Sequence, residues 1–211
     1  MDLSFIIIGV TVVISYLAFN NSNIINDFIF HPYTVKRKKQ WYRFITHGFL
    51  HGDINHLLFN MLTLFFFGPN VEAFFRLNFG TQKGNLLFIA LYFISMIASS
   101  IPAFVKHQDN TYYRSLGASG AISAVLFSFI LFAPLEPIYL FFIPIPIPGF
   151  VFAFLYLAYS AYMAKRGRDN IGHDAHFVGA VMGLLLTVAF IPSVFPEFVN
   201  TLVAAVQNLI G

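Results

Sequence analysis

The residues that could carry chemistry are one serine, two histidines and one amide, each near the start of an apolar segment. Ser119 stands in a Gly-Ala-Ser-Gly sequence, His176 follows an alanine at the start of another apolar run, and His56 precedes Asn60 by about one helical turn. Polar side chains are costly inside segments of hydrocarbon length, so they need partners or a purpose there. Their types match a nucleophile, a general base and two oxyanion donors.

A serine at the start of a helix is well placed for acyl transfer. The backbone amides of a first helical turn lack intrahelical acceptors, and together with the positive end of the helix dipole they favour an oxyanion. Gly117 and Gly120 remove side chains around the Ser119 hydroxyl, so a peptide backbone can approach it. His176 could take the proton from Ser119 and later return it to the leaving amine.

Helix geometry places the oxyanion donors together and argues against an acidic third member. His56 and Asn60 are four residues apart, so they share one face of a helix, and both can donate hydrogen bonds. Asp174 precedes His176 by two positions, roughly 200° around an ideal helix, and cannot easily orient that ring. We therefore expect a dyad of Ser119 and His176.

The composition indicates a membrane protein. Of the 211 residues, 58% are hydrophobic and 10% are charged, whereas an ordinary globular domain has about 25% charged residues. The mean hydropathy is +0.74. There is no cysteine, which excludes disulfides and cysteine-ligated metals. The net charge of +3 comes from basic residues between apolar runs, which indicates contacts with lipid headgroups and argues against a nucleic-acid partner.

The apolar segments predict an all-α, polytopic membrane protein with one domain over residues 1–211. A spanning helix needs about 20 mostly apolar residues. Six segments approach this length: 3–19, 54–75, 85–105, 117–132, 149–164 and 175–191. The first lacks a basic region before it and a small-residue cleavage site after it, so we expect a retained anchor. A long polar stretch, about 20–53, follows it.

Other segments have special roles. Residues 143–148 carry prolines at alternate positions, which break a helix, so we expect an extended apolar loop. Residues 196–210 are too short to span and are expected to lie at the interface as an amphipathic helix. The helix 149–164 is short, and its contacts with the second helix should be largely Phe and Leu side chains. We therefore expect it to move aside for substrate, and trimming Phe152 or Phe154 to raise turnover.

The order of the helices brings the polar residues together. The three helices with polar N-terminal ends would cross the membrane in the same direction, because one antiparallel span separates each from the next. Their N-terminal ends, which carry His56, Ser119 and His176, therefore share one side of the bilayer. Gly179 and Gly183 form a small-residue face that would let the last helix pack closely against the helix of Ser119.

Three motifs resemble those of the rhomboid intramembrane serine proteases. Residues 117–120 resemble the family's GxSG nucleophile motif, and residues 175–183 resemble its AHxxGxxxG motif. His51 to Asn60 reads as HxxxxHxxxN and resembles its second-helix motif, whose later histidine and asparagine are assigned to the oxyanion site. Shorter resemblances, at the start of the first loop and the end of the second helix, are Trp41-Tyr42-Arg43, Thr46-His47 and Glu72.

The resemblance extends over about residues 41–183, which is most of the chain. It implies the six-helix rhomboid fold and the hydrolysis of a peptide bond in or beside a transmembrane segment of a membrane-protein substrate. It also implies catalysis by Ser119 and His176 alone, without metal or cofactor, with His51 among the supporting residues.

Two positions depart from the family pattern. Ser123 stands four residues after the nucleophile, where many relatives carry an aromatic ring against the catalytic histidine. Phe127 stands where a small glycine is frequent. Either another group holds the ring of His176 or its orientation is looser than usual, and the helix must pack differently at Phe127.

Three other classes of protein stay open. His47 and His51 have the spacing of a zinc-binding HxxxH pair, but the glutamate base is missing and only Asp53 offers a third ligand. A non-catalytic rhomboid-like protein that binds transmembrane helices is the more serious alternative, although such relatives usually lose the serine or the histidine. A transporter would rest on Glu72 as its one intramembrane acid.

Charge and resemblance disagree about orientation. We expect an integral multi-pass protein of a prokaryotic inner membrane, and the resemblance implies an active site that opens to the outside. The positive-inside rule predicts the opposite, because basic residues at the site end outnumber Arg76 and Lys83 at the other end. Those at the site end are Lys36, Arg37, Lys38, Lys39, Arg43, Lys106, Arg114, Lys165, Arg166 and Arg168.

Overall fold

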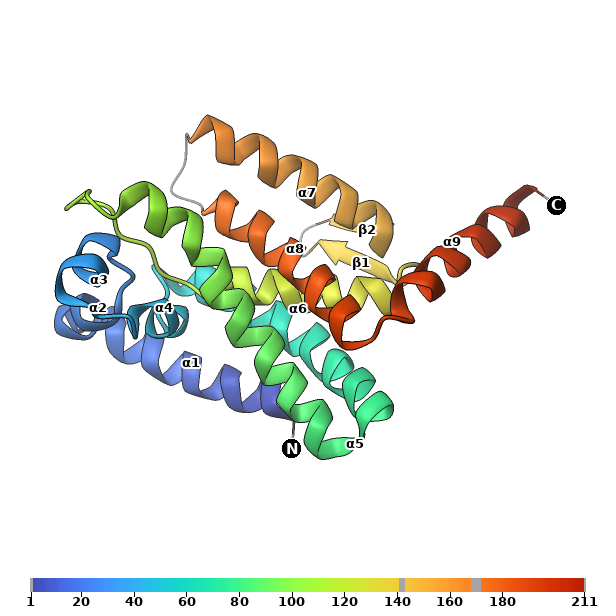
Figure 1. The fold of residues 1–211 in the computed structure, drawn as a ribbon, viewed down its shortest axis with the longest axis horizontal. Helices are drawn as coiled ribbons and strands as arrows, with labels where there is room; N and C mark the ends of the chain where they lie inside the picture. The colour runs from blue at the N-terminus through green and yellow to red at the C-terminus, as the bar shows by residue number, and fades with distance from the viewer. Residues whose placement is uncertain (1, 141–142, 168–171, 211) are drawn as a thin grey trace.

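Helix α6 (Ser119–Phe132) lies at the centre of the structure. Every residue from Gly120 to Leu131 except Phe129 is buried. The helix is apolar on all faces apart from three serines, as expected for a helix surrounded by other helices. Its main neighbours are α5 (Ile54–His107) and α8 (His173–Phe190) (Figure 1). The helix that begins with Ser119 is thus the element around which the bundle is assembled.

The computed structural model describes residues 2–140, 143–167 and 172–210, which are almost entirely helical (Figure 1). The remaining long helices are α1 (Leu3–Phe19), α7 (Gly149–Arg166) and α9 (Val194–Ile210). Helices α1, α6, α7 and α8 begin and end within two residues of the bounds expected from the sequence.

Helix α5 turns back on itself at Gly80, so one helical run contains two arms. Gly80 has φ 76° and ψ 165°, a conformation that suits glycine. Across the bend, a Cβ at Gly84 would lie 2.6 Å from the backbone nitrogen of Arg76. Arg76 Nε donates a hydrogen bond of 2.7 Å to Asn85 Oδ1. The helices expected over 54–75 and 85–105 therefore extend further than expected and meet at the bend.

The long polar stretch after α1 folds into short helices around one arginine. The buried guanidinium of Arg43 donates to the backbone oxygens of Asn26, at 2.9 Å, and Ile29, at 2.7 Å. Backbone carbonyls away from water need such donors. The short helices are α2 (Ser22–Phe28), α3 (Pro32–Lys38), α4 (Arg43–Thr46) and the 3₁₀ turn η1 (His47–Phe49).

Several of the basic residues expected to contact lipid headgroups have protein partners. Lys36 Nζ lies 2.9 Å from the Asp109 carboxylate, and Arg114 donates to the Asn26 side chain at 3.1 Å. Arg43 is buried among backbone oxygens. Arg168 lies outside the described residues. The basic residues at this end therefore order the polypeptide as well as adding charge.

The proline-rich segment is a strand and not a loop. Strand β2 (Ile143–Pro148) pairs antiparallel with β1 (Pro137–Leu140), with Ile138 opposite Ile147. Alternate residues of a strand direct their N–H groups to the same edge, so prolines at every second position remove donors from one edge only. The other edge can pair. This two-stranded hairpin is an addition to a fold that is otherwise helical over the described residues, in agreement with the all-α expectation.

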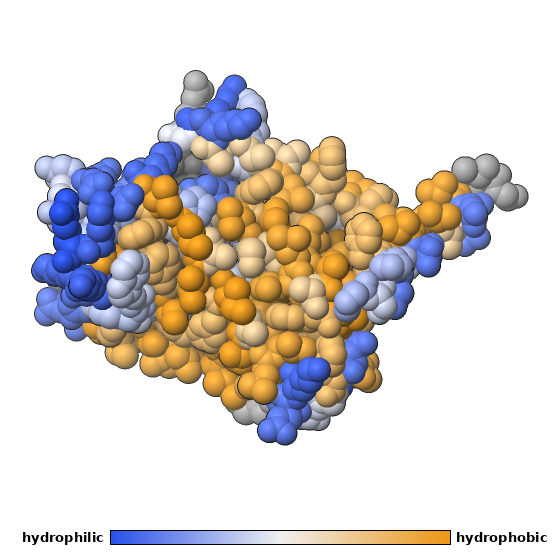
Figure 2. All heavy atoms as spheres, viewed as in Figure 1, coloured by the Kyte–Doolittle hydropathy of each residue, from blue (hydrophilic) through white to orange (hydrophobic). Residues whose placement is uncertain are grey.

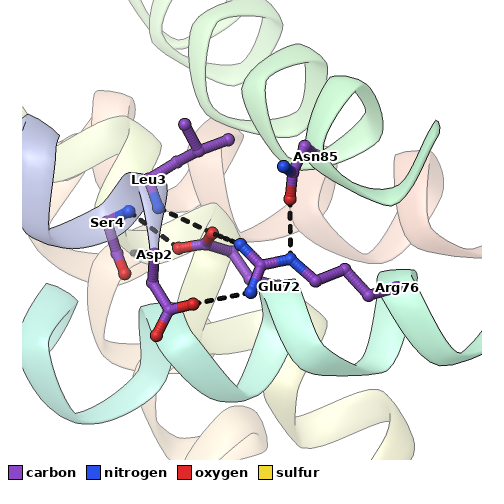
Figure 3. Close-up of polar contacts among 6 residues, drawn as sticks. All are labelled: Asp2, Leu3, Ser4, Glu72, Arg76 and Asn85. Atoms are coloured by element: carbon purple, nitrogen blue, oxygen red, sulfur yellow. Dashed lines mark hydrogen bonds and ion pairs between the residues drawn. The ribbon is translucent and has the colours of Figure 1, made fainter. Parts of the chain in front are cut away.

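A buried carboxylate on α5 caps the start of α1 (Figure 3). Glu72 is fully buried and accepts hydrogen bonds from the backbone nitrogens of Leu3, at 2.8 Å, and Ser4, at 2.7 Å. Arg76 donates to Glu72 at 2.7 Å and to Asp2 at 2.6 Å. Amides in a first helical turn have no intrahelical acceptor, so Glu72 satisfies them from another helix. Both oxygens of the Glu72 carboxylate thus accept structural hydrogen bonds, which argues against the transporter interpretation.

The hydrophobic surface and the lengths of the helices are the features that relate the bundle to a membrane. Figure 2 shows a broad hydrophobic surface over the middle of the bundle, between a hydrophilic end around α2 and α3 and a smaller hydrophilic patch near the bend of α5. Within the described residues, two helices are long and apolar enough to cross a bilayer, namely α5 with 54 residues and α8 with 18. Helices α1 and α6 are apolar but shorter. The count of six spans stays a prediction.

Helix α7 lies against the bundle differently from the expectation. It packs mainly on α8 and α6, and not on the first arm of α5. Phe154 is 73% exposed, whereas Phe152 packs against the buried side chains of α6. Trimming these two phenylalanines should therefore have different consequences, since Phe154 contributes little to holding α7 in place.

Helix α9 projects away from the bundle at its C-terminal end (Figure 1). It begins two residues before the expected tail helix 196–210. Its exposed apolar side chains recur at helical spacing and lie on one face: Phe195, Val199, Val203 and Val206. This amphipathic pattern supports the expected place at a membrane interface, which stays a prediction.

Candidate active site

Helices α6 and α8 cross in direct backbone contact. A Cβ at Gly179 would lie 2.8 Å from the Cα of Gly120 and still closer to its carbonyl oxygen. One turn further along, a Cβ at Gly183 would lie 2.7 Å from the Cα of Ala124. Neither glycine can accept a side chain without moving one helix, so the two small residues fix the distance between the helices.

This crossing places the serine and the histidine at the same corner of the bundle. Ser119 is the first residue of α6 and directly precedes Gly120, and His176 lies three residues before Gly179 on α8. A Cβ at Gly120 would lie 3.4 Å from the backbone oxygen of Ala175, the neighbour of His176. Both Ser119 and His176 are partly exposed, as a site that receives substrate and water requires.

The two expected oxyanion donors lie beside the backbone that leads into Ser119. Gly117 has a φ of 118°, which disfavours any side chain. A Cβ there would also lie 2.9 Å from His56 Nε2 and 4.0 Å from Asn60 Nδ2. The Gly117 amide donates at 3.0 Å to the His47 backbone oxygen, which fixes this turn. The first arm of α5 thus presents both side chains next to the start of α6.

A chain of hydrogen bonds runs from Asn60 to α1. Asn60 Nδ2 lies 2.9 Å from His51 Nε2, and His51 Nδ1 lies 2.9 Å from Ser15 Oγ. Ser15 Oγ donates its one hydrogen to the Phe49 backbone oxygen at 2.8 Å. His51 must therefore carry its proton on Nδ1 and accept at Nε2 from the Asn60 amide. Ser15 was not among the residues expected at the site, because nothing in its local sequence distinguishes it from a packing serine.

Burial keeps the supporting histidines neutral. Desolvation, together with a smaller contribution from the nearby His56, lowers the pKa of His51 to about 3, although Asp53 opposes this. Desolvation likewise lowers the pKa of His47 to about 4, against a hydrogen bond with the Phe44 backbone that raises it. A neutral His51 is what the hydrogen-bond chain through Asn60 requires.

The HxxxH pair points to different partners. His47 Nε2 lies 3.0 Å from Ser100 Oγ on the second arm of α5, whereas His51 contacts Ser15 and Asn60. Within residues 2–140, 143–167 and 172–210, no three His, Cys, Asp or Glu side chains gather as metal ligands. The geometry of this pair therefore gives no support to the zinc interpretation.

An aromatic ring from α7 contacts His176, which the sequence left unassigned. The Tyr156 ring lies 6.4 Å from the His176 ring, centroid to centroid, with 24° between the planes. The Tyr156 hydroxyl is hydrogen-bonded to Ser123 Oγ at 2.7 Å. Asp174 accepts from the Ala175 amide at 2.9 Å and so contributes to the start of α8.

Comparisons with known proteins agree with the motifs. A sequence model described as the Rhomboid domain matches residues 38–193. RHOMBOID-like protein 12, mitochondrial, of Arabidopsis thaliana is 29% identical over 196 residues, covering 87% of this chain and 56% of that protein. Rhomboid protease GluP of Bacillus subtilis is 31% identical over 156 residues, covering 72% and 28%. The chain spans about half the length of these relatives, or less.

A relative from yeast is named as a mitochondrial protein. Rhomboid protein 1, mitochondrial, of Saccharomyces cerevisiae is 32% identical over 143 residues, covering 65% of this chain and 38% of that protein. The similar proteins therefore include bacterial, plant and yeast members, and they do not single out the prokaryotic inner membrane expected from the sequence. Because the family model covers most of the chain, we conclude that this protein belongs to the rhomboid family, whose members are embedded in membranes.

Proposed function

We propose that this chain is an intramembrane serine endopeptidase that cleaves peptide bonds in or beside transmembrane segments of membrane-protein substrates. The observation that supports this most is the crossing of α6 and α8 at Gly120 and Gly179, which brings the helix starts of Ser119 and His176 to one corner. Relatives named as proteases, such as GluP, support the activity at the level of the family.

The proposed reaction has two steps. First, the Ser119 hydroxyl oxygen attacks the scissile carbonyl carbon while His176 accepts the hydroxyl proton. The carbon–nitrogen bond breaks, and His176 gives the proton to the leaving amine. Water then attacks the acyl-enzyme with His176 again as the base, which releases the new carboxyl terminus and restores the Ser119 hydroxyl.

The oxyanion of each step would be held by three donors. These are the side chains of His56 and Asn60 and the backbone amide of Ser119. Asn60 is suited to this because one of its amide hydrogens is committed to His51, which leaves the other to point at the substrate. Gly117 leaves space beside both side chains, because a Cβ at this position would collide with the His56 ring.

We propose six membrane-crossing helices: α1, the two arms of α5, α6, α7 and α8, with α9 at the interface. The hydrophobic surface of Figure 2 supports this arrangement. Helix α6 has 14 residues, about 21 Å at 1.5 Å each, which is shorter than a hydrocarbon core of about 30 Å. Its N-terminal end would therefore lie below the membrane surface, which would protect the site while keeping it open to water.

Cleavage by the purified protein tests this proposal. We expect Ser119→Ala and His176→Ala each to abolish cleavage of a transmembrane substrate while the thermal unfolding of the protein stays close to wild type. Ser193→Ala, an exposed serine before α9, is the matched control and should retain full activity. Turnover by Ser119→Ala would reject the serine mechanism. Wild-type binding of transmembrane helices without any cleavage would favour the non-catalytic alternative.

A further inference from the structure

We propose that Tyr156 on α7 is the positioning residue for His176, and that Ser123 and Phe127 on α6 hold Tyr156 in place. This inference rests on the proposed function, because it assigns a role to the ring against the general base. It concerns a residue on a different helix from the one that carries the aromatic ring in many relatives.

The geometry between the two rings suits this role. The planes of Tyr156 and His176 are 24° apart at a centroid distance of 6.4 Å, so the two rings form a near-parallel, stacked pair. A flat ring on one side restricts rotation of a histidine about its terminal torsion, which is otherwise broad. His173 makes an edge contact with the same imidazole, at 6.0 Å and 74°. Of these two rings, Tyr156 is the one that lies nearly parallel to the imidazole.

Tyr156 is itself held at both its polar and its apolar parts. Its hydroxyl is hydrogen-bonded to Ser123 Oγ at 2.7 Å, and Ser123 is only 5% exposed. Its ring contacts Phe127 at 5.4 Å and Phe152 at 5.6 Å between centroids. A hydrogen bond to the buried Ser123 and packed aromatic neighbours leave the tyrosine few alternative rotamers.

One substitution pattern now accounts for both departures from the family motif. Ser123 and Phe127 are four residues apart and lie on one face of α6, the face turned to Tyr156. A small residue at 123 leaves room for the tyrosine hydroxyl, and a large residue at 127 fills the space beside its ring. In this chain the aromatic ring comes from α7 and not from α6, and the side chains at positions 123 and 127 of α6 have sizes that accommodate it.

This arrangement ties the general base to the position of α7. Helix α7 packs on α8 and α6 and follows the hairpin β1–β2. If α7 moves outward to admit a substrate helix, Tyr156 leaves the His176 ring, and the return of α7 restores the contact. The base is therefore oriented only when α7 is packed against the bundle. Phe152→Ala should consequently lower turnover by loosening Tyr156, which is the reverse of the expectation from sequence.

The test compares Tyr156→Leu and Tyr156→Phe with the wild type, using Tyr162→Leu on the same helix as the control. Tyr162 is 51% exposed and its ring lies under Arg166. We expect Tyr156→Leu to lower kcat about 10- to 100-fold with KM changed less than about threefold, because a misplaced base affects the chemical step. Tyr156→Phe keeps the ring and should remain within about fivefold of wild-type kcat. Tyr162→Leu should match the wild type.

A second test places an aromatic ring on α6 in a variant that lacks Tyr156. The kcat of the double variant Ser123→Tyr/Tyr156→Ala should be at least about tenfold higher than that of Tyr156→Leu. If Tyr156→Leu does not fold, Tyr156→Met, which keeps more of the volume, is held to the same criterion. Wild-type kcat in the leucine or methionine variant would overturn the inference, as would equal losses in the phenylalanine and leucine variants.

Fluorophosphonate labelling separates this inference from the proposed function. If wild-type Ser119 is not labelled, the proposed function fails and the role of Tyr156 fails with it. If the wild type is labelled and Tyr156→Leu is labelled at the same rate, only the positioning role is overturned. The inference predicts labelling of the leucine variant about 10-fold slower or more, with thermal unfolding equal to that of Tyr162→Leu.

Discussion

The Cα of Gly179 faces the backbone of Gly120 so closely that no side chain fits between α8 and α6. Each glycine is a near neighbour in sequence of a proposed catalytic residue, His176 in one helix and Ser119 in the other. The helix contact and the dyad are therefore one structural feature, and a change in the first must alter the second.

Gly179→Ala should impair both stability and activity. The added methyl would overlap the Gly120 carbonyl group, and overpacking of this kind costs about 1–3 kcal/mol. The helices would separate and the distance between the dyad residues would grow, so we expect a fall in kcat of about 100-fold. Gly9→Ala is the control, because no atom lies within 4 Å of its added Cβ. Thermal unfolding and cleavage kinetics measure both effects; wild-type activity in Gly179→Ala would contradict the role of the contact.

The oxyanion donors can be tested by a double-mutant cycle. His56→Ala and Asn60→Ala should each lower kcat about 100- to 1000-fold without abolishing it, because the amide of Ser119 remains. The double variant should lose less than the product of the two single losses if both side chains bind one oxygen. Strictly multiplicative losses would mean that the two residues act separately.

Ser15 should influence catalysis although it lies on α1. Ser15→Ala removes the acceptor that fixes the proton of His51 on Nδ1, so the Asn60 amide loses its defined orientation. We expect kcat to fall about 10-fold with little change in KM. Thr11→Val is the matched control on the same helix, because the Thr11 hydroxyl is buried without a hydrogen-bond partner among the described residues. Equal kinetics for the two variants would argue against the hydrogen-bond chain.

The buried histidines make stability depend on pH in a predictable direction. The pKa of His51 falls from an ordinary 6.5 to about 3 on folding, so below pH 6.5 the unfolded chain binds a proton that the folded one does not. Stability should therefore be flat with pH above about 7 and decrease as the pH falls from 6.5 toward 3, by about 1 kcal/mol per pH unit. Thermal unfolding of His51→Gln should show a shallower decrease; an identical pH dependence would contradict this assignment.

The sequence was sufficient to bring Ser119, His56 and His176 to one end of the bundle. Polar residues near the helix starts, with one antiparallel helix between each pair, are enough for this, and both can be recognised from local stretches of sequence. Gly179 and Gly183 could also be predicted as contact residues, because small residues at one-turn spacing in an apolar helix favour close packing against another helix.

The contacts of Tyr156 and Ser15 could not be predicted in the same way. Ser15 meets His51 across 36 positions and Ser123 meets Tyr156 across 33, and each contact depends on the rotation of a whole helix about its axis. Weakly amphipathic helices such as α1 and α6 give no pattern that fixes this rotation. The Ser123 departure did signal that a partner was missing, but not which helix supplied it.

The most direct measurement of the central claim is the site of covalent modification by a fluorophosphonate. Intact-mass and peptide mass spectrometry should find one adduct, on Ser119, because only a serine with an adjacent base and oxyanion donors reacts rapidly. His176→Ala should remove the adduct while Ser119 is still present, and Ser193→Ala should leave it unchanged. An adduct on another serine, or equal labelling of Ser119 in His176→Ala, would contradict a Ser119–His176 dyad.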